Sequence, residues 1–305
     1  MRVVTGGEPV GVALIGSGRM GSFHGETLAR RIPGARLVAV ADPAPGAAER
    51  LAAALGGRPR VHRPGGGARR PGGRGGGDRC PGPVPRRPGR GRGGRRQGDW
   101  AAARALLEEG RLGTPRLLRS VTRDPGGFDP SRVPPGTIFN ETLIHDFDTL
   151  RFLNPGAEPV QVHATADALV ETGWRDRGLL DTAVVVVRFD NGAIGIAEAC
   201  FEAAYGYDVR GEVLGSRGMA TMGDGRRTGM VFSGAAGRSV ETVRSDQELL
   251  ASAYVAELAT FTDVVRAGAP VPAGGEDARA ALAIALAAAE SVRAGRPVRI
   301  DEAAT

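Results

Sequence analysis

Apolar and polar positions in the first part of the chain follow the order of a strand, a turn, a helix and a second strand. Residues 11–15 form an apolar run that predicts a buried strand, and residues 22–31 have the periodicity of a helix. The turn between them, residues 16–21, is rich in glycine, and a second apolar run spans residues 36–41. Because a helix separates the two runs, this pattern predicts parallel strands joined by a crossover helix.

The later part of the chain has the pattern of an antiparallel sheet with flanking helices. Asn140 is expected to cap a helix over residues 141–153, and residues 190–192 (Asp-Asn-Gly) predict a hairpin turn. Two long helices are expected at residues 247–266 and 276–293. The predicted strands are residues 160–166, 182–189, 193–201, 209–214, 219–222, 229–232, 240–243 and 298–300.

These patterns predict an α/β protein with two domains. A Rossmann-like domain is expected over residues 1–122, and it would include a helix at 101–109 and a strand at 115–121. An α+β domain with a large, mostly antiparallel sheet is expected over residues 123–305. One face of that sheet is expected to be open to solvent or to a partner.

Composition sets residues 56–98 apart from the rest of the chain. Gly, Arg and Pro fill 36 of these 43 positions, so the segment has no strand pattern and too little apolar surface to offset its ordering entropy. All 40 basic residues of the chain are Arg, and 13 of them lie here. The net charge of +6 therefore arises in this segment, because the remainder carries a net charge of −6.

An Arg/Gly-rich segment suggests a remote alternative, an RNA-binding protein that uses the segment as a tether to phosphates. The segment has no aromatic side chain for base stacking, and the remainder of the chain is acidic. We therefore expect no nucleic-acid partner.

Other classes of protein are disfavoured by what the sequence contains. No apolar run approaches the ~20 residues that a membrane-spanning helix needs, and the N-terminal pattern is not that of a signal peptide. The two cysteines, Cys80 and Cys200, are too few for a disulfide framework or a metal cluster. The sequence predicts a cytoplasmic protein with no membrane partner and no metal.

The glycine turn has the spacing of a dinucleotide-binding loop. In this pattern, Gly16 allows the tight turn, Gly18 lets the backbone approach a pyrophosphate, and Gly21 lets the helix pack closely. Asp42 follows the second strand, where its carboxylate can bind the adenosine ribose and repel a 2′-phosphate, which favours NAD over NADP. The alternative is an ordinary glycine turn without a ligand. The predicted cofactor-binding residues are Gly16, Ser17, Gly18, Arg19, Met20, Gly21 and Asp42.

Glu141 and His145 are the candidate catalytic residues. Their spacing of four places both side chains on one face of the predicted helix, where the carboxylate can orient the imidazole and raise its basicity. Such a histidine can take a proton from an alcohol while a hydride leaves for a nicotinamide. The spacing alone favours an ordinary surface or interface histidine on an acidic helix.

Two further segments carry polar residues that could meet a substrate. Arg123 and Asp124 end a predicted strand at a loop, and Tyr205 and Tyr207 begin another strand. A simple turn and cross-strand packing are the alternatives for these two segments.

Three runs of residues resemble the Gfo/Idh/MocA oxidoreductase family, and within it the bacterial inositol 2-dehydrogenases. The resemblance extends roughly over residues 10–55 and 99–300. The runs that carry it are residues 12–21 with Asp42, residues 136–148 (Gly-Thr-Ile-Phe-Asn-Glu-Thr-Leu-Ile-His-Asp-Phe-Asp), and residues 205–213 (Tyr-Gly-Tyr-Asp-Val-Arg-Gly-Glu-Val).

The resemblance implies NAD-dependent oxidation of a cyclic polyol or sugar hydroxyl to a ketone. It implies that His145 is the general base and that Glu141 stands where these enzymes usually carry Asp. It also implies an open sheet in the C-terminal domain that mediates a dimer or tetramer. The residues expected on the substrate side are Arg123, Asp124, Asp146, Tyr205 and Tyr207.

One departure from the family concerns lysine. These enzymes carry a Glu-Lys-Pro motif whose Lys helps the proton transfer, and this chain contains no Lys. Arg is no simple replacement, because its guanidinium is larger and effectively never deprotonates. A catalytically impaired member is therefore an alternative. The motif would fall within residues 56–98, and we hypothesise that this segment is translated out of frame, which sequencing of its codons would test.

Overall fold

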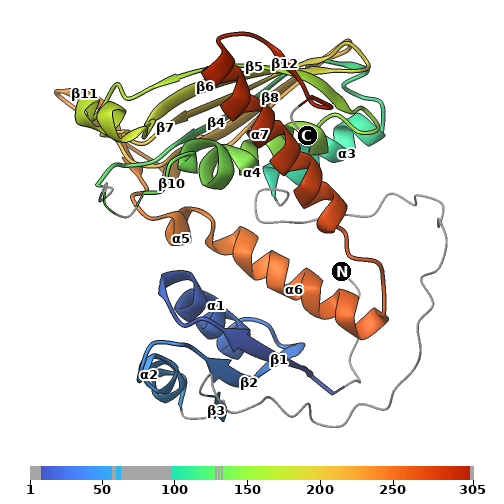
Figure 1. Cartoon of the computed structure of the whole chain (residues 1–305). Helices are drawn as coiled ribbons and strands as arrows, with labels where there is room; N and C mark the ends of the chain where they lie inside the picture. The colour runs from blue at the N-terminus through green and yellow to red at the C-terminus, as the bar shows by residue number, and fades with distance from the viewer. Residues whose placement is uncertain are drawn as a thin grey trace. The chain divides into compact units, whose positions relative to one another are not determined.

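The computed structural model describes residues 8–56, 60–62, 98–127, 129, 131 and 133–302 (Figure 1). The chain divides into two compact units. The first contains the described residues up to 62 together with Tyr254–Pro272, and the second contains those from 98 to Ala253 and from Ala273 onward. Most of the Gly/Arg/Pro-rich segment lies outside the described residues.

The first unit confirms the predicted strand–helix–strand pattern. Its strands form a parallel sheet in the order β1-β2-β3, and buried Leu28, Leu37 and Val40 pack in its core with Leu258 of helix α6 (Ala251–Ala267) against them. The elements are β1 (Val10–Ile15), α1 (Arg19–Arg30), β2 (Ala35–Ala41), α2 (Ala47–Ala54) and β3 (Arg60–His62). The expectation of no strand within residues 56–98 is wrong for β3, because the edge of β2 supplies it with backbone hydrogen-bond partners.

The second unit contains the predicted large sheet. Its seven strands run in the order β12-β5-β6-β7-β4-β8-β9, and every neighbouring pair is antiparallel except β4 and β7. The strands are β4 (Pro115–Arg123), β5 (Pro159–Asp167), β6 (Thr182–Phe189), β7 (Ile194–Cys200), β8 (Asp208–Gly215), β9 (Met219–Met222) and β12 (Val298–Arg299).

Helices cover one face of this sheet. Helices α4 (Leu143–Phe152) and α7 (Gly275–Ala294) pack against each other and against the sheet (Figure 1). The core between them contains buried Leu143, Phe147 and Ile284. The mostly antiparallel sheet and the α/β fold class are therefore confirmed.

The expected boundary at residue 122 needs correction. Strand β4, which is expected in the Rossmann-like domain, lies inside the large sheet, paired with β7 and β8. Helix α3 (Asp99–Glu108) also belongs to the second unit, where Ala103 and Leu107 join the core. Sequence order placed these elements with the first domain, but their apolar sides are buried in the second.

Two predicted strands near the end of the second unit form a separate ribbon. Among the described residues, strands β10 (Arg226–Gly234) and β11 (Gly237–Thr242) pair only with each other, and the short helix α5 (Asp246–Leu249) follows them. A 3-10 helix spans Thr172–Arg177. In the part of the chain that the structure describes, no helix has both the length and the apolar character to cross a membrane.

Candidate functional site

The glycine turn after β1 has the geometry that its sequence pattern predicts. Gly16 has a φ of +94°, and its N–H donates to the carbonyl of Ala41 at 2.8 Å, which ties the turn to the end of β2. A Cβ on Gly21 would lie 2.0 Å from the carbonyl oxygen of Gly16, so only glycine allows this approach. A Cβ on Gly18 would meet nothing within 4 Å, which leaves space next to the backbone.

Helix α1 begins at Arg19, three residues earlier than predicted, with extended Gly18 as its N-cap. Arg19 and Met20 therefore belong to the first helical turn. The N-terminus of a helix presents backbone N–H groups and a partial positive charge, which together suit a phosphate group.

Asp42 is bonded directly to this turn. Its Oδ2 accepts hydrogen bonds from the backbone N–H of Ser17 at 2.6 Å and from the Ser17 hydroxyl at 2.8 Å, while Oδ1 accepts one from the N–H of Ala44 at 2.8 Å. These bonds, the Ser17 N–H first, hold the pKa of the Asp42 carboxyl below its usual value. The structure thus brings the predicted cofactor residues together, and it adds a contact between Ser17 and Asp42 that sequence spacing did not reveal.

The segment with the candidate catalytic residues is not a simple capped helix. A π-helical turn spans Ile138–Thr142 and runs into α4, so the predicted N-cap at Asn140 is wrong. Glu141 lies in the π turn and His145 lies in the first turn of α4, and both side chains are exposed. The predicted spacing of four in a regular α-helix therefore does not describe this pair. Single π turns are frequent at functional sites.

Asp146 has a structural contact in place of the expected substrate contact. Its side chain is fully buried, at 0% exposure, and it accepts hydrogen bonds from the hydroxyls of Ser120 at 2.5 Å and Thr122 at 2.8 and 2.9 Å. These bonds join α4 to β4. A carboxylate without exposed surface cannot bind a substrate hydroxyl, so this expectation is corrected.

Arg123 and Tyr205 meet in a polar network at the end of β4. The guanidinium of Arg123 donates to the Tyr205 hydroxyl at 3.2 Å and to Glu198 at 3.1 Å, and the Tyr205 hydroxyl donates to Asp208 at 2.7 Å. The Tyr205 hydroxyl is the main cause that raises the pKa of Arg123. Burial alone would raise the pKa of Asp208, but hydrogen bonds from Arg210 and Tyr205 and the nearby positive charges lower it.

The other two predicted substrate residues are held by their backbones. Asp124 is buried, and its N–H donates to the carbonyl of Cys200 at 2.9 Å. The N–H of Tyr207 donates to the carbonyl of Val243 at 2.7 Å. Sequence reasoning missed Glu198 as a member of the network, although strand alternation places it on the same sheet face as Val184 and Ile196.

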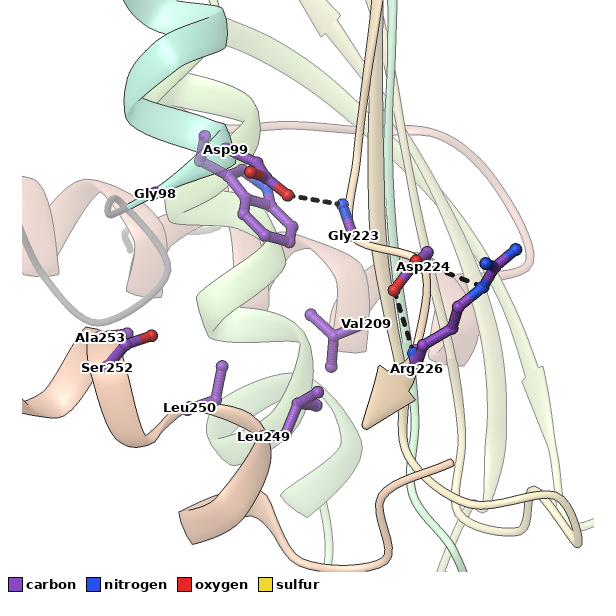
Figure 2. Close-up of a pocket in the computed structure, with 12 residues that line it drawn as sticks. Gly98, Asp99, Val209, Gly223, Asp224, Arg226, Leu249, Leu250, Ser252 and Ala253 are labelled. Atoms are coloured by element: carbon purple, nitrogen blue, oxygen red, sulfur yellow. Dashed lines mark hydrogen bonds and ion pairs between the residues drawn. The ribbon is translucent and has the colours of Figure 1, made fainter. Parts of the chain in front are cut away.

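A pocket of about 240 Å³ lies elsewhere in the second unit (Figure 2). Asp99 of α3 accepts a hydrogen bond from the N–H of Gly223 at 3.4 Å in its wall, and Asp224 pairs with Arg226. None of the residues predicted for cofactor, substrate or catalysis lines this pocket. Among the residues that the structure describes, no three His, Cys, Asp or Glu side chains are grouped to hold a metal ion.

Comparison with known proteins gives a family match for the second unit. Residues 100–221 match the GFO/IDH/MocA C-terminal domain. The second unit is therefore similar to the C-terminal domain of the GFO/IDH/MocA family. The predicted resemblance is thereby confirmed, and the matched segment includes β4, the π turn and α4 of the second unit.

Two similar proteins carry inositol dehydrogenase names. The chain is 38% identical over 199 residues to myo-inositol 2-dehydrogenase of Thermotoga maritima, covering 64% of this chain and 59% of the relative. It is 32% identical over 203 residues to scyllo-inositol 2-dehydrogenase (NAD(+)) of Bacillus subtilis, covering 66% and 59%. The alignment thus spans less than two thirds of the length of these relatives.

A solved structure shares the fold. Scyllo-inositol dehydrogenase from Lactobacillus casei, with bound NAD(H) and scyllo-inositol, superposes with a TM-score of 0.81 at 18% identity, covering 96% of this chain and 100% of that chain. This likeness shows that the chain shares the fold of that structure, a Rossmann-like domain plus a C-terminal α/β domain.

Proposed function

We propose that this protein is an NAD-dependent dehydrogenase of the GFO/IDH/MocA family, in the cytoplasm, that oxidises a ring hydroxyl of an inositol-like polyol to a ketone. The observation that carries the proposal is the glycine turn closed onto Asp42, with hydrogen bonds of 2.6–2.8 Å. A carboxylate held at this point suits a ribose with free hydroxyls and opposes a 2′-phosphate. The inositol class of substrate rests on the names of the relatives.

The residues of the first unit supply a fitting site for NAD. Gly18 and the N-terminus of α1 would bind the pyrophosphate, and Asp42 would bind the adenosine ribose. NAD, when bound, accepts the hydride. The close approach of Gly21 to Gly16 fixes the turn before any cofactor arrives, so little ordering is needed on binding.

The residues of the second unit would bind the substrate and accept its proton. His145 is exposed, as a general base must be, and would take the proton from the reacting hydroxyl. Glu141, exposed on the preceding turn, would stabilise the imidazolium that forms. Arg123 and Tyr205 carry hydrogen-bond donors and acceptors that would orient the other ring hydroxyls, and Asp124 and Tyr207 stay predictions as substrate residues.

The absence of Lys from the sequence supports the second candidate, an impaired dehydrogenase. Without an ammonium near the reacting hydroxyl, His145 would have to accept the proton unaided. We therefore expect turnover to be slow relative to family members that have the Glu-Lys-Pro motif, even where NAD binds normally.

His145→Ala is expected to lower kcat for myo-inositol oxidation by about 100-fold or more, because the general base is lost. The affinity for NAD should not change, since His145 lies outside the glycine turn. Formation of NADH, followed by fluorescence, measures the first quantity, and calorimetry measures the second. Asp176→Ala changes an exposed side chain of the 3-10 helix in the same unit, and as a control it should leave both unchanged. Equal kcat in wild type and His145→Ala would refute the assignment.

We also propose that a second copy of the chain covers the open face of the large sheet. This face exposes apolar side chains of neighbouring strands, including Val184 (44%), Ile194 (41%) and Met219 (56%). Arg119, which carries an ion pair with Glu198, adds polar contacts on the same face. Exposed apolar groups gathered on one sheet face are typical of an interface between subunits.

Val184→Glu is expected to dissociate this homo-oligomer, because the new carboxylate would be buried without a partner. Light scattering after gel filtration gives the mass. Val271→Glu changes a more exposed valine (65%) in a loop of the first unit and should leave the mass unchanged. A wild-type mass of one chain would contradict the proposed assembly.

A further inference from the structure

Ser17 supplies most of the bonds that hold the Asp42 carboxylate. Two of the three hydrogen bonds that Asp42 accepts come from Ser17, one from its N–H at 2.6 Å and one from its hydroxyl at 2.8 Å. Both are directed at the same oxygen, Oδ2, and the third bond reaches Oδ1 from Ala44. The side chain of Ser17, which lies between two glycines of the turn, therefore contacts Asp42 directly.

These bonds limit how the carboxylate can move and how much of it is available. An ionised carboxylate offers about four acceptor positions, so three bonds leave about one for a ligand hydroxyl. The lowered pKa of Asp42, caused first by the Ser17 N–H, keeps this group charged at neutral pH. The negative charge is thus present at neutral pH, and the hydrogen bonds fix its direction beside the glycine turn.

We infer that Ser17 is a specificity-determining residue that acts through Asp42, holding its carboxylate where it rejects the 2′-phosphate of NADP. The inference rests on the proposed function, since it assumes that the turn binds a nicotinamide dinucleotide. Rejection of a 2′-phosphate depends on the distance between two negative charges. Without the Ser17 hydroxyl, the two backbone bonds to Asp42 remain, but Oδ2 keeps only one of its two donors, so the carboxylate can shift further from an incoming phosphate.

Removal of the hydroxyl should therefore affect the affinities for NADP and NAD differently, so that the ratio of the two dissociation constants changes. For Ser17→Ala, the ratio of Kd for NADP to Kd for NAD is expected to fall about tenfold, the effect of one charge-assisted hydrogen bond. Ser17→Thr keeps the hydroxyl and should keep the ratio. Asp42→Asn removes the charge itself and should lower the ratio furthest.

Ser22→Ala is the matched control for a purely structural effect. The Ser22 hydroxyl donates to the carbonyl of Ser17 at 2.9 Å, so its loss loosens the same turn without touching Asp42. A looser turn should weaken both dinucleotides equally and leave their ratio unchanged. Isothermal titration calorimetry with NAD and NADP on all five proteins gives the constants, and circular dichroism confirms that each is folded.

The outcomes separate the inference from the proposed function. Wild-type protein that binds NAD, with an unchanged ratio in Ser17→Ala, would overturn the role of Ser17 and leave the dehydrogenase proposal standing. An equal loss of both affinities in Ser17→Ala would also overturn it, because the residue would then serve the turn alone. Wild-type protein that binds neither dinucleotide would overturn the proposed function, and the role of Ser17 with it.

Discussion

Gly21→Ala is expected to weaken NAD binding by about 100-fold, equivalent to two lost charge-assisted hydrogen bonds. The added Cβ would lie 2.0 Å from the carbonyl oxygen of Gly16 and 2.7 Å from its carbonyl carbon. Both atoms are backbone, so no side chain can move aside and the turn itself has to open. Opening the turn redirects the N–H groups at the start of α1 away from the pyrophosphate.

Gly18→Ala separates the effect on folding from the effect on binding. A Cβ on Gly18 meets nothing within 4 Å, so this variant should unfold at the wild-type temperature, whereas Gly21→Ala should unfold earlier. Both variants should bind NAD poorly, because the methyl group added at Gly18 would occupy the path of the pyrophosphate. Thermal melts and calorimetry with NAD measure the two properties. Normal NAD binding by both variants would show that the turn is not a dinucleotide site.

Asp146→Ala is expected to reduce the free energy of unfolding of the second unit by about 3 kcal/mol, because it removes the acceptor to which two buried hydroxyls donate. Those hydroxyls belong to Ser120 and Thr122 of β4, and they are 1% and 3% exposed. The loss would loosen α4, which carries His145, so the affinity for substrate should also fall.

Urea unfolding followed by tryptophan fluorescence measures this effect. Asp146→Asn keeps one acceptor oxygen and should lose less stability than Asp146→Ala. Asp176→Ala removes an exposed carboxylate from the 3-10 helix of the same unit and serves as the control, with a change expected to lie within about 0.5 kcal/mol. Wild-type stability in Asp146→Ala, combined with loss of polyol binding, would restore the original expectation of a substrate contact.

The burial of Asp146 could not be predicted from the sequence. The family resemblance suggested a ligand contact for Asp146, whereas Leu143 and Phe147 of the same helix are buried in the core. Whether a carboxylate faces water or two hydroxyls depends on the strand that lies opposite. That strand, β4, is more than 20 residues away along the chain, and no local pattern encodes the pairing.

Features that depend on neighbouring residues could be predicted from the local sequence. The spacing of Gly16, Gly18 and Gly21 defines the turn because each glycine meets a local steric demand, and alternation along β6 and β7 defines which side chains face the core. Features that depend on residues far apart in the sequence became visible only in the tertiary structure. Only the folded structure shows that β4 belongs to the large sheet, that a π turn precedes α4, and that the Ser17 hydroxyl donates to Asp42. These contacts form only when segments far apart in the chain meet, because their free energy comes from pairing and burial and not from local conformational preference.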